Sequence, residues 1–212
     1  MPSSSALNDL VIIDYGMANL RSVQKAFEAV GVAAEISSDP ERVAKAGKIV
    51  LPGVGAFRDA IAKLRSSGLA EVIQQHIQRG SPFLGICLGY QMLFTRSHED
   101  GLHLGLDILP GEVVCFDKAH GLKIPHMGWN TLELTLPDCP LFAGLPPKPA
   151  VYFVHSYYPT VQTQDLIAAV ARYPEPFPAV IWRDNLFATQ FHPEKSQAIG
   201  QTMLKNFAEI RA

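Results

Sequence analysis

Residues 83–94 read FLGICLGYQMLF and place a cysteine, Cys87, between two glycines. An apolar run leads into the cysteine and predicts a buried strand over residues 82–86, while the amphipathic stretch after Gly89 predicts a helix. Gly85 and Gly89, two residues before and two after the thiol, leave room for a sharp turn between these elements. The stretch therefore predicts a strand, a tight turn that carries the thiol, and a helix.

The chain before this stretch repeats the same alternation. Apolar runs predict strands over residues 10–14, 33–36 and 48–52, and apolar residues at helical spacing predict helices over residues 20–30, 57–64 and 69–77. Continuously apolar strands that alternate with amphipathic helices indicate a parallel sheet covered on both faces. The first half of the chain is therefore predicted to be doubly wound α/β.

The second half has short strands with proline-rich connections. We expect strands over residues 113–116, 131–136, 151–154, 167–171, 179–182 and 186–191, and a closing helix over residues 199–210. These strands are interpreted as antiparallel or mixed additions to the same sheet. The predicted fold is α/β: an open, mostly parallel central sheet with helices on both faces and antiparallel additions. Residues 9–212 are expected to form a single domain after a flexible tail, residues 1–8.

The composition excludes several classes of protein. With 212 residues, 48% of them hydrophobic, the chain can bury a large core, and its net charge of −2 gives no electrostatic reason to expect nucleic acid or an anionic membrane as partner. The three cysteines are not at CxxC spacing, which argues against a zinc site and fits a reducing compartment. The N-terminus is not typical of a signal peptide, and no apolar run reaches the length of a spanning helix. We therefore expect a cytoplasmic protein.

The turn at Cys87 has the pattern of a nucleophile. Gly85-Ile86-Cys87-Leu88-Gly89 is G-x-C-x-G, which matches the nucleophile elbow G-x-S-x-G with cysteine in place of serine. The start of the helix that follows would stabilise the reactive thiolate. The alternative is that Cys87 is a small buried apolar residue. Cys115 and Cys139 have no such context, so we expect them to be ordinary buried residues.

A thiol nucleophile needs a base and a group that orients the base. His192 follows a predicted strand and begins the sequence His192-Pro193-Glu194, in which the carboxylate can reach back to the imidazole. The alternative is that His192 and Glu194 are ordinary polar residues on the surface. A third predicted strand ends in PGVG, where Gly53 lets backbone N–H groups approach a developing oxyanion, with the amide of Leu88 as second donor. The alternative for PGVG is an ordinary strand-to-helix turn.

Taken together, these residues resemble the class I glutamine amidotransferases over nearly the whole chain. GICLGYQ and FHPEKS match the Cys-His-Glu triad of that family in order and spacing. Within the family the chain is most similar to the glutaminase subunits of histidine biosynthesis. The supporting stretches are DYGMANLRSV (14–23), LPGVGAF (51–57), IPHMGWN (124–130), YFVHSYY (152–158) and HPEKS (192–196). Ala18 stands where such subunits often have glycine.

The resemblance implies the chemistry. Cys87 attacks the side-chain amide of L-glutamine, His192 deprotonates the thiol and later protonates the departing ammonia, and Glu194 orients His192. Water hydrolyses the glutamyl thioester to glutamate. The residues carried over as oxyanion or glutamine contacts are Gly53, Val54, Leu88, Gln91, Glu99, Ser156 and Tyr157. The alternative for Gln91 and Glu99 is a solvated helix face.

The resemblance also implies a partner. The ammonia passes to a separate (β/α)8-barrel cyclase in a heterodimer, which uses it on a phosphoribulosyl ribonucleotide and yields imidazole glycerol phosphate and an aminoimidazole carboxamide ribonucleotide. No metal and no organic cofactor is implied. The predicted docking face carries Met127, Trp129, Asn130, Tyr152 and Lys195, and the alternative for Trp129 and Tyr152 is ordinary core. We also expect the isolated chain to be a poor glutaminase, because the glycine-flanked PGVG peptide can turn a carbonyl toward the oxyanion site until the partner docks.

Three other functions remain open from the residues. Another ammonia-supplying subunit, such as that of anthranilate or aminodeoxychorismate synthase, is opposed by PGVG, PHMGWN and HPEKS. A non-catalytic partner-binding module on the same fold is opposed by the intact triad. A flavodoxin-like cofactor binder would not need the paired Cys and His-Pro-Glu features.

Overall fold

The computed structural model describes residues 9–117, 121 and 123–211, so the predicted flexible tail of residues 1–8 lies outside the described residues. The first half contains β1 (Leu10–Ile13), α1 (Leu20–Ala29), β2 (Ala34–Ser37), α2 (Pro40–Lys45), β3 (Lys48–Gly53), α3 (Phe57–Ser66), α4 (Leu69–Gln78), β4 (Phe83–Cys87), α5 (Leu88–Gln91) and β5 (Phe94–Ser97). The second half contains β6 (His103–Leu104), β7 (Leu109–Cys115), β8 (His126–Thr131), β9 (Glu133–Leu134), β10 (Ala150–His155), β11 (Tyr157–Val161), β12 (Ile167–Arg172), β13 (Pro176–Arg183), β14 (Leu186–Thr189) and α6 (Gln197–Glu209). Three 3₁₀ turns complete the described elements: η3 (Pro140–Phe142), η4 (Gln164–Leu166) and η5 (Pro193–Lys195).

The central sheet has eight strands in the order β2-β1-β3-β4-β14-β13-β12-β9. The pairs from β2 to β14 are parallel, and β13, β12 and β9 continue the sheet in antiparallel fashion. The predicted class, an open and mostly parallel α/β sheet with antiparallel additions, is confirmed. Because β3, β4 and β14 are parallel neighbours, the residues that follow their carboxyl ends meet at one edge of the sheet.

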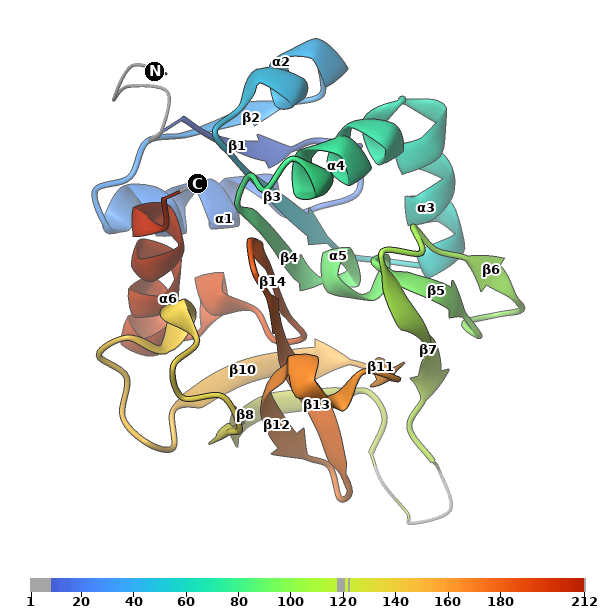
Figure 1. Ribbon diagram of the computed structural model, residues 1–212. Coiled ribbons are helices and arrows are strands. Elements are labelled where there is room, and N and C mark those ends of the chain that lie inside the picture. Colours follow the sequence, from blue (N-terminus) through green and yellow to red (C-terminus); the bar gives the residue numbers. More distant parts are fainter. Residues whose placement is uncertain (1–8, 118–120, 122, 212) are drawn as a thin grey trace.

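Helices cover both faces of this sheet (Figure 1). Successive side chains of a strand point to opposite faces. Val11 and Ile13 of β1 pack in the core with α2, α3 and α4, whereas Leu10 and Ile12 pack in the core with α1 and α6. None of the helices in the described part of the chain is long and apolar enough to cross a membrane.

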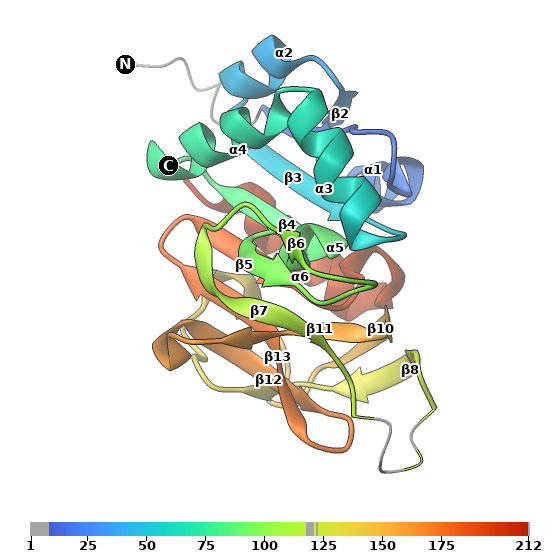
Figure 2. The same cartoon turned by 90° about the vertical axis from the view of Figure 1, so that its right-hand side faces the viewer.

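The expectation that the strands of the second half extend the central sheet is wrong for two of them, those over residues 113–116 and 151–154, which correspond to β7 and β10. Strands β10 and β8 form a two-stranded sheet, and β7 and β11 belong to a four-stranded sheet in the order β11-β7-β5-β6. The free edge of β14 is taken by the β13-β12-β9 group, so the remaining strands pair with each other. Figure 2 shows these strands below the layer of α2, α3 and α4.

The helix expected from Gly89 onward is also corrected. Helix α5 spans four residues, and the chain re-enters extended structure at Phe94 in β5. Phe94 and Thr95 favour strands, and β5 gains a parallel partner in β7 and an antiparallel one in β6. A longer helix would leave β6 without its partner and β7 with β11 alone.

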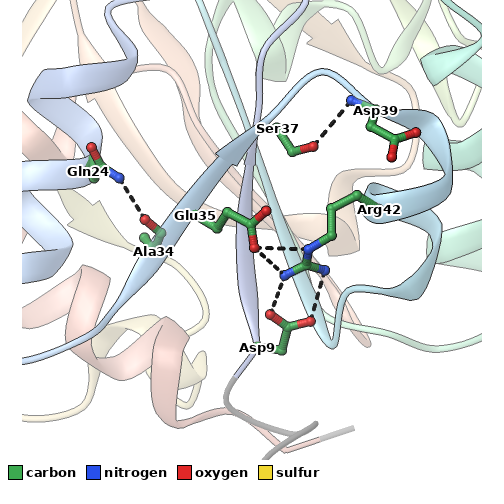
Figure 3. A network of polar contacts seen from close by, with 7 residues as sticks. All are labelled: Asp9, Gln24, Ala34, Glu35, Ser37, Asp39 and Arg42. Carbon is green, nitrogen blue, oxygen red and sulfur yellow. Dashed lines mark hydrogen bonds and ion pairs between the residues drawn. The ribbon is translucent and has the colours of Figure 1, made fainter.

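Helix α2 was not predicted, because six residues are too short to show a helical period. Its start is nevertheless encoded locally: the side chain of Asp39 accepts a hydrogen bond from the N–H of Glu41, and Pro40 occupies the first turn. Arg42 on α2 then ties the helix to the sheet, with hydrogen bonds to Asp9 before β1 and to Glu35 on β2 (Figure 3). This network fastens the sheet edge remote from Cys87.

Candidate active site

Cys87 sits at the turn between β4 and α5 in a strained backbone, with φ 55° and ψ −108°. Such a positive φ is uncommon for any residue other than glycine. The turn is tight: a Cβ on Gly89 would come within 1.8 Å of the carbonyl oxygen of Leu51 on β3. Gly89 is therefore required for the close approach of α5 to the sheet, and the predicted elbow is confirmed as a local geometry.

A cavity of about 330 Å³ opens in front of the thiol. It brings together these predicted site residues: Val54, Cys87, Leu88, Gln91, Glu99, Ser156, Tyr157, His192 and Lys195. Gly53 and Glu194 lie outside its lining, and so do Met127, Trp129, Asn130 and Tyr152. Residues from β4, α5, β10, β11 and η5, with others from the loop after β3, thus surround one space large enough for a small amino acid.

His192 and Glu194 form the predicted base and orienting group. Nδ1 of His192 lies 2.7 Å from Oε1 of Glu194, and both side chains are almost fully buried. Burial lowers the pKa of His192, but the negative charge and hydrogen bond of Cys87 and then of Glu194 outweigh it and raise this pKa to about 10. An imidazole placed between a thiol and a carboxylate in this way can hold the thiol proton.

The loop that carries His192 is fixed to strand β10. The N–H of His192 donates to the carbonyl of Tyr152 at 3.0 Å, and the N–H of Tyr152 donates to Oγ of Ser196 at 2.9 Å. Oγ of Ser196 in turn donates to the carbonyl of His192 at 2.7 Å. Strand β10, which also pairs with β8, therefore fixes the position of His192 relative to the central sheet.

The PGVG stretch lies against the elbow. Gly53 pairs with Cys87, and a Cβ there would come within 2.6 Å of the Tyr15 hydroxyl and 2.9 Å of Cβ of Leu88, so only glycine fits. The N–H of Val54 donates to the carbonyl of Met17 at 3.2 Å. This N–H is therefore engaged with the loop after β1 and not directed at an oxyanion in the cavity.

Glu99 and Gln91 have structural partners besides the cavity they line. Oε2 of Glu99 accepts from the N–H of Phe57 at the start of α3 at 2.9 Å, and burial raises the pKa of this carboxyl despite that hydrogen bond. Nε2 of Gln91 donates to the carbonyl of Tyr157 at 2.8 Å. Neither residue is on a solvated helix face, which was the alternative.

The predicted docking residues lie on the β8–β10 ladder and its neighbour η5. Trp129 pairs with Tyr152 across the ladder, and Met127 is exposed beside them, which excludes the core alternative for Trp129. Asn130 does not share this face. Strand alternation turns its side chain inward, where it lies 3.3 Å from Nε2 of His126 and donates to the carbonyl of Arg172.

Sequence reasoning missed three residues at the site. Gln190, fully buried, points its Nε2 at Sγ of Cys87 at 3.9 Å, and His155 lines the cavity. The hydroxyl of Tyr15 is buried with no hydrogen-bond partner among the described residues, and burial followed by the charge of Cys87 raises its pKa. Their only sequence signal is position, because each lies at or just past the end of a predicted strand.

The described residues contain no group of three or more His, Cys, Asp or Glu placed to hold a metal ion.

Comparison with known proteins gives the family of the chain. A sequence profile of the family "Glutamine amidotransferase class-I" matches residues 11–210. In fold, the chain is similar to the crystal structure of a putative GMP synthase protein from Thermoplasma acidophilum, with a TM-score of 0.70 and 22% identity over 94% of this chain and 91% of that one. The chain belongs to the class I glutamine amidotransferase family.

Within that family the chain groups with one subunit type. It is 54% identical to the imidazole glycerol phosphate synthase subunit HisH of Syntrophotalea carbinolica, over 95% of this chain and all of that one. It is 51% identical to HisH of Geobacter sulfurreducens, over 97% of this chain and all of that one. The resemblance to the glutaminase subunits of histidine biosynthesis is thereby confirmed.

Proposed function

We propose that this chain is the glutaminase subunit of imidazole glycerol phosphate synthase. It hydrolyses L-glutamine to glutamate and ammonia, and the ammonia passes to a cyclase subunit of histidine biosynthesis. The observation that carries the proposal is the buried His192–Glu194 pair facing Cys87 on its strained turn. The HisH names of the relatives support the pathway.

The chemistry follows from the arrangement of the triad. The Cys87 thiolate attacks the side-chain amide carbon of glutamine, and the C–N bond breaks as the imidazolium of His192 gives its proton to the leaving nitrogen. This step releases ammonia and leaves a glutamyl thioester. His192 then takes a proton from water, the hydroxide attacks the thioester, and glutamate leaves while the sulfur regains its negative charge. Glu194 holds the Nδ1 proton of His192 and stabilises the imidazolium.

Glutamine is held by the cavity lining. We assign its main-chain groups to Glu99, Ser156 and Tyr157 and its side chain to the space between Gln91 and the thiol. The half-buried carboxylate of Glu99 suits the α-ammonium group of an amino acid. Together with the amide of Leu88, in the first turn of α5, these groups would place the scissile amide at Cys87.

The resting PGVG stretch supports a switch. With the N–H of Val54 engaged at Met17, only the Leu88 amide remains for the oxyanion, so the isolated chain is a poor glutaminase. Rotation of the Gly53–Val54 peptide would release the second donor, and glycine at 53 and 55 makes that rotation sterically easy. We propose that docking of the cyclase favours the rotated state.

The docking face of this proposal is Met127, Trp129, Tyr152 and Lys195. Trp129 is half exposed and packs edge-on against Tyr152 at 6.0 Å between ring centroids, and Lys195 borders the cavity from η5. An exposed aromatic pair beside a lysine has the composition of an interface anchor. The same proposal places the heterodimer in the cytoplasm, in keeping with three free cysteines.

Glutamate release from glutamine tests the proposal in three arms: the isolated chain, the chain with its cyclase, and the complex with a cyclase ligand. We expect slow release in the first arm and stimulation in the others, with Cys87→Ala as the blank in each. No release above that blank in any arm would reject the glutaminase function and favour a non-catalytic module. Full activity in the first arm would reject the switch alone.

A further inference from the structure

A line of hydrogen bonds through two buried imidazoles runs from strand β8 to the glutamine cavity. Nδ2 of Asn130 lies 3.3 Å from Nε2 of His126, and Nδ1 of His126 lies 3.0 Å from Nε2 of His155. Nδ1 of His155 lies 2.9 Å from the carbonyl oxygen of Tyr157. We call Asn130, His126 and His155 the imidazole chain.

The direction of each hydrogen bond in the imidazole chain follows from the end at which His155 meets the carbonyl of Tyr157. A backbone carbonyl can only accept, so Nδ1 of His155 must carry the proton that faces Tyr157. In a neutral ring Nε2 is then an acceptor. His126 must therefore donate to it from Nδ1, which leaves Nε2 of His126 as an acceptor as well.

The other end of the imidazole chain, at Asn130, gives the same direction independently. Nδ2 of Asn130 donates to the carbonyl of Arg172 at 2.9 Å, and Oδ1 of Asn130 accepts from the N–H of Thr131 at 2.8 Å. These backbone groups set the orientation of the amide, so a nitrogen and not an oxygen faces His126. Donors and acceptors match along the whole imidazole chain only if both rings are neutral Nδ1–H tautomers.

Two buried amides continue from the same carbonyl to the nucleophile. Nε2 of Gln91 donates to the Tyr157 carbonyl at 2.8 Å and to Oε1 of Gln190 at 3.1 Å. Because the carbonyl can only accept, the nitrogen of Gln91 must face it, and the oxygen of Gln190 must face that nitrogen. Nε2 of Gln190 therefore points at Sγ of Cys87, 3.9 Å away. We call Gln91 and Gln190 the amide pair.

The surroundings bury both rings and favour their neutral form. Burial lowers the pKa of His126 to about 4 and that of His155 to about 3, the latter against its hydrogen bond to Tyr157 and with the charges of His126 and His192 adding to the fall. Aromatic rings within 6.2 Å between centroids surround them: Phe116, Phe153, Tyr173 and Phe177. A broken bond in such a site leaves a buried polar atom unsatisfied, which is costly.

We propose that the imidazole chain and Gln190 are positioning elements of the glutaminase site. The imidazole chain holds the Tyr157 carbonyl, this carbonyl orients the amide of Gln91, and Gln190, oriented by Gln91, directs an N–H at the sulfur of Cys87. An N–H aimed at sulfur favours the thiolate, which is the nucleophile. Both protons of the Gln91 amide are used, so its Oε1 is the group left to contact glutamine. The kinetic consequences rest on the proposed glutaminase function, whereas the tautomers do not.

The first test is NMR of the isolated wild-type chain with ¹⁵N-labelled histidine at neutral pH. We expect His126 and His155 each to give the signature of a neutral ring protonated at Nδ1, with the His126→Phe variant providing the assignment. An Nε2–H tautomer or an imidazolium at either position would overturn the proposal. This measurement needs neither substrate nor partner.

The second test is glutamate release by the complex with the cyclase. His126→Phe keeps a ring stacked between Phe153 and Tyr173 but removes both nitrogens. We expect KM for glutamine to rise roughly tenfold with a smaller change in kcat, since the imidazole chain shapes the cavity and does not react. The matched control is His76→Phe, which removes a buried histidine bonded to Pro82 and Arg79 and should keep the wild-type KM. Unchanged KM and kcat in His126→Phe would refute the role of the imidazole chain.

The third test is alkylation of the Cys87 thiol by iodoacetamide, followed by mass spectrometry of its peptide. Gln190→Met retains length but removes the N–H, and we expect alkylation to slow roughly tenfold at neutral pH. An unchanged rate would refute the role of Gln190. The wild-type complex could lack glutaminase activity and still show the expected tautomers and the slower alkylation in Gln190→Met. The proposed function would then be rejected, while the hydrogen bonding of the imidazole chain and the amide pair would be supported.

Discussion

Replacement of Glu194 by glutamine probes the triad most directly, because it removes a charge and keeps the shape. The carboxylate lies 2.7 Å from Nδ1 of His192, and the two side chains are only 2% and 4% exposed, so water cannot replace it. Oε2 of Glu194 has no hydrogen-bond partner among the described residues. No hydrogen bond at that position would therefore fix the amide of a glutamine with its oxygen toward His192. An amide N–H facing Nδ1 would hold His192 in the wrong tautomer, with its proton on Nε2.

The magnitude follows from this burial. A hydrogen bond to a charged group contributes about 1.5–3 kcal/mol, and removal of one partner of a buried pair costs about 3–5 kcal/mol. We take about 4 kcal/mol for the imidazolium formed during the reaction, which corresponds to roughly a 10³-fold loss of rate. The change should fall on kcat and not on KM, and the pKa of His192 should fall with the loss of the carboxylate.

The assay is steady-state glutamate release by the complex with its cyclase. The control is Glu209→Gln on α6, an exposed carboxylate that should leave both constants unchanged. Unchanged kcat with a raised KM in Glu194→Gln would show that Glu194 contacts glutamine and does not orient the base.

Three further predictions concern the nucleophile, the docking face and stability. Cys87→Ala should abolish glutamine hydrolysis yet leave the fold, partner binding and ammonium-dependent synthesis by the complex intact; residual glutaminase near wild type would remove Cys87 from the mechanism. Trp129→Ala should weaken the complex by about 2 kcal/mol, measured by titration of the cyclase, and an unweakened complex would refute the docking face. Burial lowers the pKa of His76 to about 4, so the folded state resists protonation that the unfolded chain accepts near pH 6.5. The free energy of unfolding should thus be fully developed above pH 6.5 and fall as the pH drops to about 4, and a His76→Phe variant with the same acid slope in denaturant titrations would contradict this.

The sequence was most informative where the physics is local. Apolar runs and helical spacing are set by neighbours along the chain, and they correctly predicted the parallel sheet and helices α1, α3, α4 and α6. The sequence also predicted the triad, because a G-x-C-x-G turn and His-Pro-Glu each place a candidate reactive side chain at a strand end. Parallel strands bring such ends to one edge, and the structure gathers Cys87 and His192 around one cavity.

Strand pairing in the second half could not be read from the sequence. A short apolar run predicts a strand but not which edge it joins, since pairing depends on which hydrogen-bonding edges are already occupied. Strand β13 pairs with the free edge of β14. Strand β5 pairs with β7, so the short helix α5 ends before Phe94 and the chain continues as a strand. The separate β8–β10 sheet follows from the same competition.

By itself, then, the sequence determined the class of fold and the family and predicted the nucleophile and its base, because these depend on local turns and on periodicity. Only the tertiary structure decided that Val54 donates to Met17, that Asn130 donates to Arg172 and that Gln190 points at Cys87. Each of these is a hydrogen bond between segments far apart in the chain. Its direction depends on which donors and acceptors burial has left without water, and no spacing along the sequence records that.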